Sequence, residues 1–325
     1  KTDHGGWRGY LETDEQRKAV LGGTMPPYEC TQSKGLYQDE QLRDKVIDDL
    51  RRMKKAKEPF FIAAGFLKPH LPFAAKQEFW DRYDPAKIDL ADNPFRPKGA
   101  PDAAMHNWGE LRQYDGIPKR GPMDEKMMRK LVHGYYACVS ATDHYIGQVL
   151  AELENLGLAD DTIVVLWGDH GWNLGEHGLW CKHCNFETSL HAPLIVRAPG
   201  MKAGLRTRAL AESVDIYPTL CELTGLKTPE HVEGLSLRPL MERPDRAWKS
   251  AAFSRYMAGD SVRTDRYRYT QWSDKQGKQT SRMLYDHEKD PGENVNIAED
   301  PAMAGVVAEM EKRIADGWKA ARPAM

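Results

Sequence analysis

The stretch Thr162-Ile163-Val164-Val165-Leu166-Trp167, followed by Gly168-Asp169-His170-Gly171, decides the fold class. Its apolar part is a short continuous run, which is typical of a strand buried on both faces of a sheet. The glycines after it indicate a turn, and the polar residues between them stand where the strand ends. The stretch therefore predicts a buried strand with reactive side chains at its carboxyl end.

A similar run lies earlier in the chain. Pro59–Leu67 is apolar throughout and is followed by Lys68 and His70 in a proline-rich loop. Between the two runs, apolar residues recur at helical spacing from Asp124 to Gly157, and a glycine at that place is typical of a helix C-cap. Strand, long helix, strand is a βαβ unit, whose two strands run parallel. We therefore expect the polar residues after both runs to meet at one rim of the sheet.

The spacing of apolar residues and the positions of Pro and Gly predict the other helices and strands. Residues 84–122 carry many Pro, Gly and Asp and are expected to be irregular. The predicted elements are a helix over 37–57, a strand over 193–196, a helix over 215–223 before Gly225, a strand over 261–272 paired with 282–286, and a closing helix over 301–321. The sequence pattern changes near residue 245, so we expect an α/β domain over 1–244 and a small α+β subdomain over 245–325.

Composition narrows the class of protein. The 325 residues carry 46 Lys+Arg and 48 Asp+Glu, so no basic field attracts nucleic acid or an acidic membrane. Hydrophobic residues make up 41%, which supports a buried core and excludes a disordered chain. The longest apolar run is too short to span a bilayer, so no transmembrane helix is predicted. Five cysteines are too few for a disulfide scaffold.

Each candidate residue has a functional and a structural interpretation. Asp169 could bind a cation or cap the turn after the strand. His170 could be a ligand or the hydrogen-bond partner of a carboxylate. Lys68 and Lys182 could contact an anion or be ordinary surface charges. His70 favours function more strongly, because its two flanking prolines stiffen the loop that carries it.

The segment after Asp169 contains a second pattern. Cys181-Lys182-His183-Cys184 imitates a redox or zinc motif, but no second pair at ligand spacing accompanies it. Two small half-buried thiols are therefore the favoured interpretation, and a redox or zinc protein ranks last among the alternatives. We expect Glu176 and His177 to brace the loop by hydrogen bonds. No glycine-rich phosphate loop and no Gly-x-Ser-x-Gly elbow is present.

Four stretches together resemble a known family. The segment from Gly168 to Glu187, GDHGWNLGEHGLWCKHCNFE, resembles the C-terminal signature of type I sulfatases, closest to the iduronate-2-sulfatase branch. The segments Phe66–Phe73, His191–Ile195 and Leu284–Asn296 are similar to that branch as well. The resemblance covers essentially the whole chain. It implies an alkaline-phosphatase-like sulfatase fold of the α/β class, with a mainly parallel central sheet flanked by helices and a small C-terminal α+β subdomain.

The resemblance also implies roles for the candidate residues. Asp169 and His170 would lie at the metal, which is Ca²⁺ or alternatively Mg²⁺, and His170 could instead hydrogen-bond the nucleophile or sulfate oxygens. His70 and Lys182 would bind the sulfate and bridging oxygens, with His70 as the acid, and Lys68 is a candidate contact to an acidic sugar. Cleaving a sugar sulfate needs such a charge clamp and a proton donor near the leaving oxygen.

The family's nucleophile is a formylglycine made in a Cys/Ser-x-Pro/Ala-x-Arg segment. The segments beginning at Cys30 and Cys138 do not match that pattern. We therefore expect the formylglycine on an N-terminal segment outside this chain, retained as a separate fragment or absent, and we expect this chain alone to be inactive. The family implies a periplasmic, secreted or lysosomal protein. Whether the protein forms a homodimer is left open by the sequence.

The leading hypothesis is a sulfuric ester hydrolase that removes sulfate from a sulfated sugar or polysaccharide. The first alternative is a phosphomonoester or phosphonate hydrolase of the same superfamily. The second is a non-catalytic glycan-binding relic that has lost its nucleophile. Which sugar and which ring position are involved depends on loops whose conformation the sequence does not determine.

Overall fold

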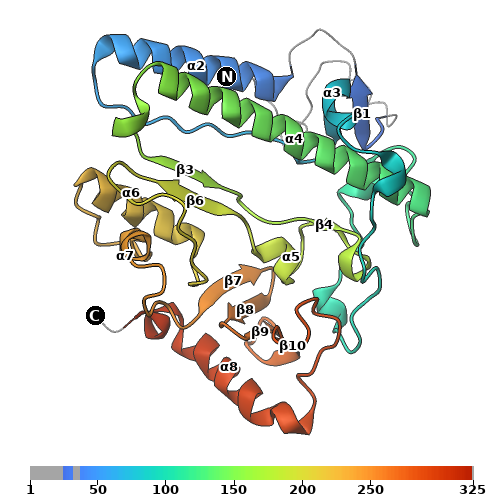
Figure 1. The fold of residues 1–325 in the computed structure, drawn as a ribbon. Helices are drawn as coiled ribbons and strands as arrows, with labels where there is room; N and C mark the ends of the chain where they lie inside the picture. Colours follow the sequence, from blue (N-terminus) through green and yellow to red (C-terminus); the bar gives the residue numbers. More distant parts are fainter. Residues whose placement is uncertain (1–24, 32–36, 324–325) are drawn as a thin grey trace. The chain divides into compact units, whose positions relative to one another are not determined.

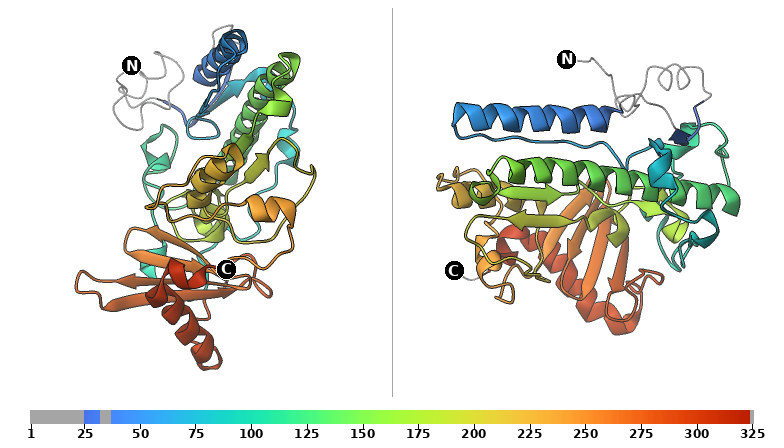
Figure 2. Two further views of the ribbon diagram at one scale, coloured as in Figure 1. Left: turned by 90° about the vertical axis from the view of Figure 1, so that its left-hand side faces the viewer. Right: turned by 45° about the horizontal axis from the view of Figure 1, so that its top comes forward.

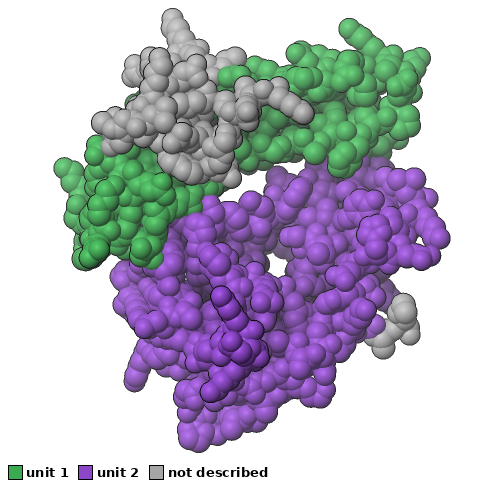
Figure 3. Space-filling view, turned by 180° about the vertical axis from the view of Figure 1, so that it is seen from behind, with its two compact units in different colours: residues 1–92, 107–162 green, residues 93–106, 163–325 purple. Residues whose placement is uncertain are grey.

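The computed structural model describes residues 25–31 and 37–323, and these form two compact units (Figures 1 and 3). The first unit comprises residues 1–92 and 107–162, and the second comprises residues 93–106 and 163–325. This division into units does not test the predicted domain boundary at residue 245, which stays a prediction.

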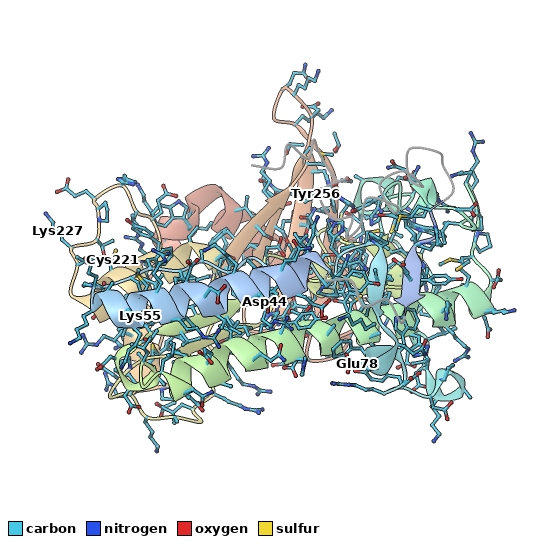
Figure 4. All side chains as sticks on the ribbon, turned by 90° about the horizontal axis from the view of Figure 1, so that it is seen from above. Asp44, Lys55, Glu78, Cys221, Lys227 and Tyr256 are labelled. Atoms are coloured by element: carbon cyan, nitrogen blue, oxygen red, sulfur yellow. The ribbon has the colours of Figure 1, made fainter. Side chains whose placement is uncertain are left out.

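Two parallel helices dominate the first unit (Figure 1). α2 (Gln38–Ala56) and α4 (Glu125–Asn155) pack along each other, as predicted from their apolar periodicity (Figures 1 and 2). α4 begins where Asp124 caps it, because the Asp124 carboxylate accepts the Met127 backbone N–H at 2.8 Å. Charged residues such as Asp44 and Lys55 lie along α2 (Figure 4).

A small parallel sheet packs against α4 in the same unit. β1 (Tyr28–Thr31) pairs with β2 (Phe73–Lys76), and the short helix α3 (Gln77–Trp80) follows directly. The contact requires a glycine in the helix, because a Cβ at Gly134 would lie 2.9 Å from Phe73 and Trp80. The parallel pair therefore lies next to the predicted crossover helix, but it uses strands other than those predicted.

The predicted first strand is wrong in the structure. Pro59–Leu67 forms neither helix nor strand, and the Phe61 side chain is 80% exposed. A continuous apolar run indicates an extended backbone, but a strand also needs a neighbouring strand to accept its hydrogen bonds. Among the described residues no strand pairs with this run. The predicted parallel pairing of the two apolar runs is therefore not formed.

The second predicted run does form a strand in the second unit. β3 (Val164–Trp167) pairs with β6 (Leu194–Arg197), close to the bounds predicted for both. The pairing is antiparallel, and the two strands form a sheet of their own within the described residues. Neither strand is fully buried, since Trp167 is 51% and Ile195 62% exposed. The expectation of burial on both faces is therefore wrong for this sheet.

The C-terminal strands make an antiparallel sheet with its own core (Figure 2). α8 (Ala304–Asp316) packs on the sheet, with Val307 and Met310 beside Tyr269 and Leu284. The predicted strand over 261–272 is divided, because a turn at Thr264 interrupts it, where the Thr264 N–H donates to the Tyr267 carbonyl at 2.8 Å. The strands are β7 (Ala252–Tyr256), β8 (Gly259–Arg263), β9 (Tyr267–Ser273) and β10 (Gln279–Asp286), in the order β10-β9-β8-β7.

Shorter elements complete the second unit. The predicted helix before Gly225 is α6 (Ile216–Thr224), and Gly225 adopts a left-handed conformation at its C-cap, as expected. The others are β4 (Asn173–Leu174), β5 (Trp180–Cys181), α5 (Glu187–Leu190) and α7 (Arg238–Glu242). Residues 84–122 are irregular apart from short 3-10 turns, as predicted. No helix in the described part of the chain is both long and apolar enough to cross a membrane.

Candidate active site

The polar residues after β3 belong to a compact hairpin, which we call the site loop (residues 168–187). Its two short strands are antiparallel, with Asn173 opposite Cys181 and Leu174 opposite Trp180. Asn173 is fully buried, and its side-chain amide donates to the Cys181 carbonyl and to the Ser189 hydroxyl, both at 2.8 Å. A single buried amide thus joins both strands of the loop to helix α5.

A glycine makes the start of this loop possible. A Cβ at Gly171 would lie 2.0 Å from the Thr188 carbonyl oxygen, which no side chain can tolerate. The Gly171 N–H donates to the Ser189 carbonyl at 2.8 Å, so the backbone contact is also a hydrogen bond. The glycine-rich character of the segment therefore has a packing cause, which fixes where Asp169 and His170 emerge.

Two of the predicted site residues, His170 and Lys182, lie against Trp172, and Asp169 lies beside His170. The His170 ring stacks on Trp172 with their centroids 6.2 Å apart, and the Lys182 ammonium lies 5.0 Å from the centroid of the same indole ring. His170 also lies against Asp169, with Nε2 3.5 Å from the carboxylate, and its backbone N–H donates to that carboxylate at 3.1 Å. The loop therefore places a carboxylate, an imidazole and an ammonium group in one neighbourhood.

Asp169 suits a hard cation. Its side chain is 82% exposed, and a carboxylate is the oxygen donor that Ca²⁺ and Mg²⁺ prefer. Ca²⁺ takes roughly six to eight oxygen ligands, so Asp169 would be one ligand among several. The one group of His, Cys and acidic side chains found close enough to share a cation, within the described residues, lies elsewhere, at Glu187, His287 and Glu293. The donor set around Asp169 thus fits part of a cation site.

Lys68 and His70 lie in the first unit, in the loop that leads to β2. Lys68 is only 5% exposed, so the surface-charge interpretation is wrong for it. Its ammonium donates to the Pro72 carbonyl at 2.9 Å and its backbone N–H donates to Asp39. The Asp39 carboxyl is buried, and burial raises its pKa despite the hydrogen bonds from Leu67 and Lys68. Lys68 therefore holds this loop in place.

The His70 ring sits between two oxygen acceptors. Nδ1 lies 2.9 Å from the Leu71 carbonyl, and Nε2 lies 2.9 Å from the Glu110 carboxylate. An imidazolium has two N–H donors and can satisfy both oxygens at once. The side chain is largely buried, so its orientation is fixed by this pair of contacts. Such a ring is suited to hold a proton at a defined place, as a general acid must.

Of the remaining residues of the site loop, Glu176 and His177 behave as predicted, and the two cysteines differ from the prediction in burial. Glu176 accepts the Leu174 backbone N–H at 2.6 Å, and His177 Nε2 lies 2.8 Å from the Gly292 carbonyl, so both brace the loop. Cys181 and Cys184 are not joined in a disulfide and are buried rather than half-buried. Burial raises the pKa of the Cys184 thiol, partly offset by hydrogen bonds from Ser189 and Asn173, which makes it an unreactive packing residue.

The sequence did not predict an ion-pair network that joins the site loop to the C-terminal sheet. Arg268 on β9 contacts both Glu187 and Glu293, and His287 Nε2 lies 2.9 Å from the same Glu293 carboxylate. Burial alone would raise the pKa of Glu187, but the charges of Arg268, Arg263 and His287 outweigh it and lower that pKa. The signal in the sequence was the turn Asp290-Pro291-Gly292-Glu293, which contributed only to the family resemblance.

Comparison with known proteins identifies the family. A family model described as sulfatase matches residues 8–226, and one described as N-sulphoglucosamine sulphohydrolase, C-terminal, matches residues 175–320. Iduronate 2-sulfatase of Mus musculus is 32% identical over 309 residues, covering 73% of this chain and 56% of the relative. The chain belongs to the sulfatase family. It spans about half the length of this curated relative.

Solved structures agree with the sulfatase fold. A structure solved with its substrate D-glucosamine-2-N,6-O-disulfate has a TM-score of 0.74 at 23% identity, covering 86% of this chain and 69% of that one. A phosphonate monoester hydrolase from Silicibacter pomeroyi has a TM-score of 0.75 at 25% identity, covering 95% of this chain and 66% of that one. The predicted alkaline-phosphatase-like fold is confirmed for this sulfatase-family chain, although its described strands do not form the predicted parallel pair.

Proposed function

We propose that this chain is part of a sulfuric ester hydrolase that removes sulfate from a sulfated sugar or polysaccharide. The observation that carries the proposal is that His170 and Lys182 lie against Trp172 and Asp169 lies beside His170, within the segment that resembles the sulfatase signature. With a cation on Asp169, a loop with this set of side chains is suited to hold an anionic sulfate group. Sulfate-ester cleavage needs such groups, because negative charge shifts along the bond that breaks.

Each side chain has a distinct part in the proposed reaction. The Lys182 ammonium donates to sulfate oxygens and stabilises their charge. Asp169 would hold Ca²⁺, or alternatively Mg²⁺, which when bound supplies positive charge to the sulfate group. His170 lies against the Asp169 carboxylate and orients it, or donates to a sulfate oxygen.

A separate role is proposed for His70, which lies in the first unit. We infer that its ring donates a proton to the bridging ester oxygen, since sugar alkoxides are poor leaving groups without one. The contact with Glu110 supports this role, because it holds the ring in one orientation. Lys68 is kept as a contact to an acidic sugar with weaker support, since its ammonium already donates to backbone carbonyls.

We infer that the nucleophile lies outside these residues, as a formylglycine on an N-terminal segment retained as a partner chain or as part of a longer chain. Two observations support this. The chain covers 56% of the mouse relative, and β3 and β6 form a two-stranded sheet, which is marginal in isolation. The exposed Trp167 and Ile195 on these strands are suited to pack against further polypeptide.

The relatives support a proposed substrate class, and the family supports a proposed location. One similar structure holds a disulfated glucosamine, and the mouse relative is named for iduronate. We infer a sulfated glycan substrate and a periplasmic, secreted or lysosomal protein. One observation favours a second function, because the phosphonate monoester hydrolase is as similar in structure as the sugar-bound sulfatase neighbour.

Turnover by the full-length gene product separates these functions. The protein should hydrolyse aryl sulfates and sulfated glucosamine or uronate sugars, and it should do so much faster than aryl phosphates or phosphonate monoesters. A large preference for phosphate or phosphonate would replace the proposal by the second function. Binding of sulfated sugar without any turnover, together with a full-length sequence that lacks a Cys/Ser-x-Pro/Ala-x-Arg segment, would leave only a glycan-binding relic.

A further inference from the structure

A single turn near the C-terminus holds the site loop at two points. We call it the tail turn (residues 286–295). At the first point, His177 Nε2 lies 2.8 Å from the Gly292 carbonyl. At the second, the Glu187 backbone N–H donates to the Glu293 carboxylate, also at 2.8 Å. Lys182 lies midway between the two attachment points along the chain.

The second attachment is the stronger of the two. The Glu293 side chain is 1% exposed, and its carboxylate also meets Arg268 Nε at 3.1 Å and His287 Nε2 at 2.9 Å. Arg268, 4% exposed, continues to the Glu187 carboxylate. A buried charge network of this kind is costly to break at one end, because the remaining partner is left buried and unpaired.

The same donor set could be mistaken for a cation site. The ligand atoms of Glu187, His287 and Glu293 lie within 4.8 Å of one another. Two guanidinium groups already supply the positive charge there, since Arg268 contacts both carboxylates and Arg263 Nε lies 3.5 Å from Glu187. The geometry therefore indicates an ion-pair network rather than a bound metal.

The tail turn itself is stiff. The Asp290 carboxylate accepts the backbone N–H groups of Asn294 and Val295 at 2.6 and 2.9 Å. Asn93 reinforces the first attachment, because its side-chain amide donates to the Gly292 carbonyl at 3.0 Å. Both attachments of the site loop thus end on a turn whose own backbone is fixed.

We propose that Glu293 is a positioning residue for Lys182, acting through Glu187 and Arg268. The inference rests on the proposed function of Lys182 as a sulfate-binding group. The C-terminal sheet is then a part of the catalytic apparatus, since it sets the place of the ammonium group without touching substrate. An ammonium that must meet a developing negative charge gains most from such preorganisation.

Hydrogen exchange in the full-length protein tests this directly. Glu293→Gln removes the charge but keeps the shape of the side chain. We expect the backbone amides of residues 176–186 to exchange roughly tenfold to a hundredfold faster, because a hydrogen bond to a charged group is lost. Exchange in α4 should be unchanged. The matched control is Glu299→Gln, which removes an exposed carboxylate that pairs with Arg282 on the same sheet at 2.7 Å and should leave the site loop unaffected.

A double variant separates positioning from general stability. Glu293→Gln combined with Arg268→Met leaves no unpaired guanidinium, so the melting temperature should return toward that of the wild type. The site loop should still exchange fast. Recovery of both together, or wild-type exchange in Glu293→Gln alone, would overturn the inference.

Kinetics provide the second readout. In Glu293→Gln, kcat for a sulfate ester should fall about tenfold or more, while KM changes little, because the misplaced ammonium matters most in the transition state. Unchanged kcat with a loosened loop would also overturn the inference. Should the wild type not hydrolyse sulfate esters at all, the proposed function fails, and the exchange experiment still decides whether Glu293 holds the loop.

Discussion

Two segments of this chain look alike in sequence and differ in structure. Pro59–Leu67 and Thr162–Trp167 are both short apolar runs that end in polar residues. The second forms β3, pairs with β6 and leads into a loop held by buried hydrogen bonds. The first forms no strand, and its Phe61 is exposed. An apolar run therefore predicts an extended backbone, whereas a strand depends on a partner that lies far away in sequence.

The largest expected effect is that of the carboxylate after the second run. Asp169→Asn should lower kcat/KM of the full-length protein for a sulfate ester by about a thousandfold, or roughly 4 kcal/mol, because it removes a carboxylate ligand of the proposed cation, whose positive charge holds the sulfate group. Glu58→Gln, an exposed carboxyl beside the first run, is the matched control and should retain full activity. Equal activity of the two variants would remove Asp169 from the site.

The next effect compares Gly171, which follows the second run, with Gly65, which lies within the first run. Gly171→Ala should lower the free energy of unfolding by about 3 kcal/mol or more, since its Cβ would meet the Thr188 carbonyl at 2.0 Å. Gly65→Ala should change it by less than about 0.5 kcal/mol, since nothing lies within 4 Å of the added Cβ. Thermal or denaturant unfolding measures both, and similar losses in the two variants would contradict the difference in packing.

A smaller effect comes from a histidine near the braced loop. Burial, and secondarily the neighbouring His183, lowers the pKa of His106 from 6.5 to about 4. The unfolded chain therefore binds a proton between pH 6.5 and 4 that the folded chain does not, so the free energy of unfolding falls as the pH is lowered through that window.

His106→Asn should remove part of this pH dependence, on the order of 1–2 kcal/mol between the two ends of the window once partial exposure is allowed for. Denaturant unfolding at several pH values measures the slope. His231→Asn, at an exposed position, should leave the slope as it is. An unchanged slope in His106→Asn would show that this ring is not kept neutral by its surroundings.

The smallest effect concerns the apolar side chain that the first run leaves exposed. Phe61→Ser should alter the free energy of unfolding of this 325-residue chain by no more than about 0.5 kcal/mol, because the ring is 80% exposed. In the full-length protein the same substitution should cost about 3 kcal/mol if the run is covered by further polypeptide. Equal, small effects in both would show that the run stays uncovered.

Local patterns predicted the elements whose causes are local. The α4 helix was predicted from its apolar spacing, its Asp124 cap and the glycine that follows it, and each acts within a few residues. The division between β8 and β9 was missed because Thr264 carries no strong turn signal, although its N–H closes a turn onto Tyr267. Strand β7 was missed as well, since its pairing with β8 is a tertiary contact.

The site was predicted as far as side chains near each other in sequence can reveal it. Asp169, His170 and Lys182 lie in one signature segment. In the structure His170 and Lys182 lie against Trp172, and Asp169 lies beside His170. Glu293 and Arg268 could not be found in that way, because they support the loop from segments about a hundred residues away. The spacing of the family signature says which groups are present, and only tertiary structure says what holds them.

The central claim is that Asp169 and Lys182 act on the same sulfate group. A crystal structure of the full-length protein with a bound sulfated sugar tests it most directly. We predict the Lys182 ammonium within hydrogen-bond distance of the sulfate group, and the Asp169 carboxylate beside a cation that touches it. A sulfate bound elsewhere, out of reach of Lys182, would contradict the claim.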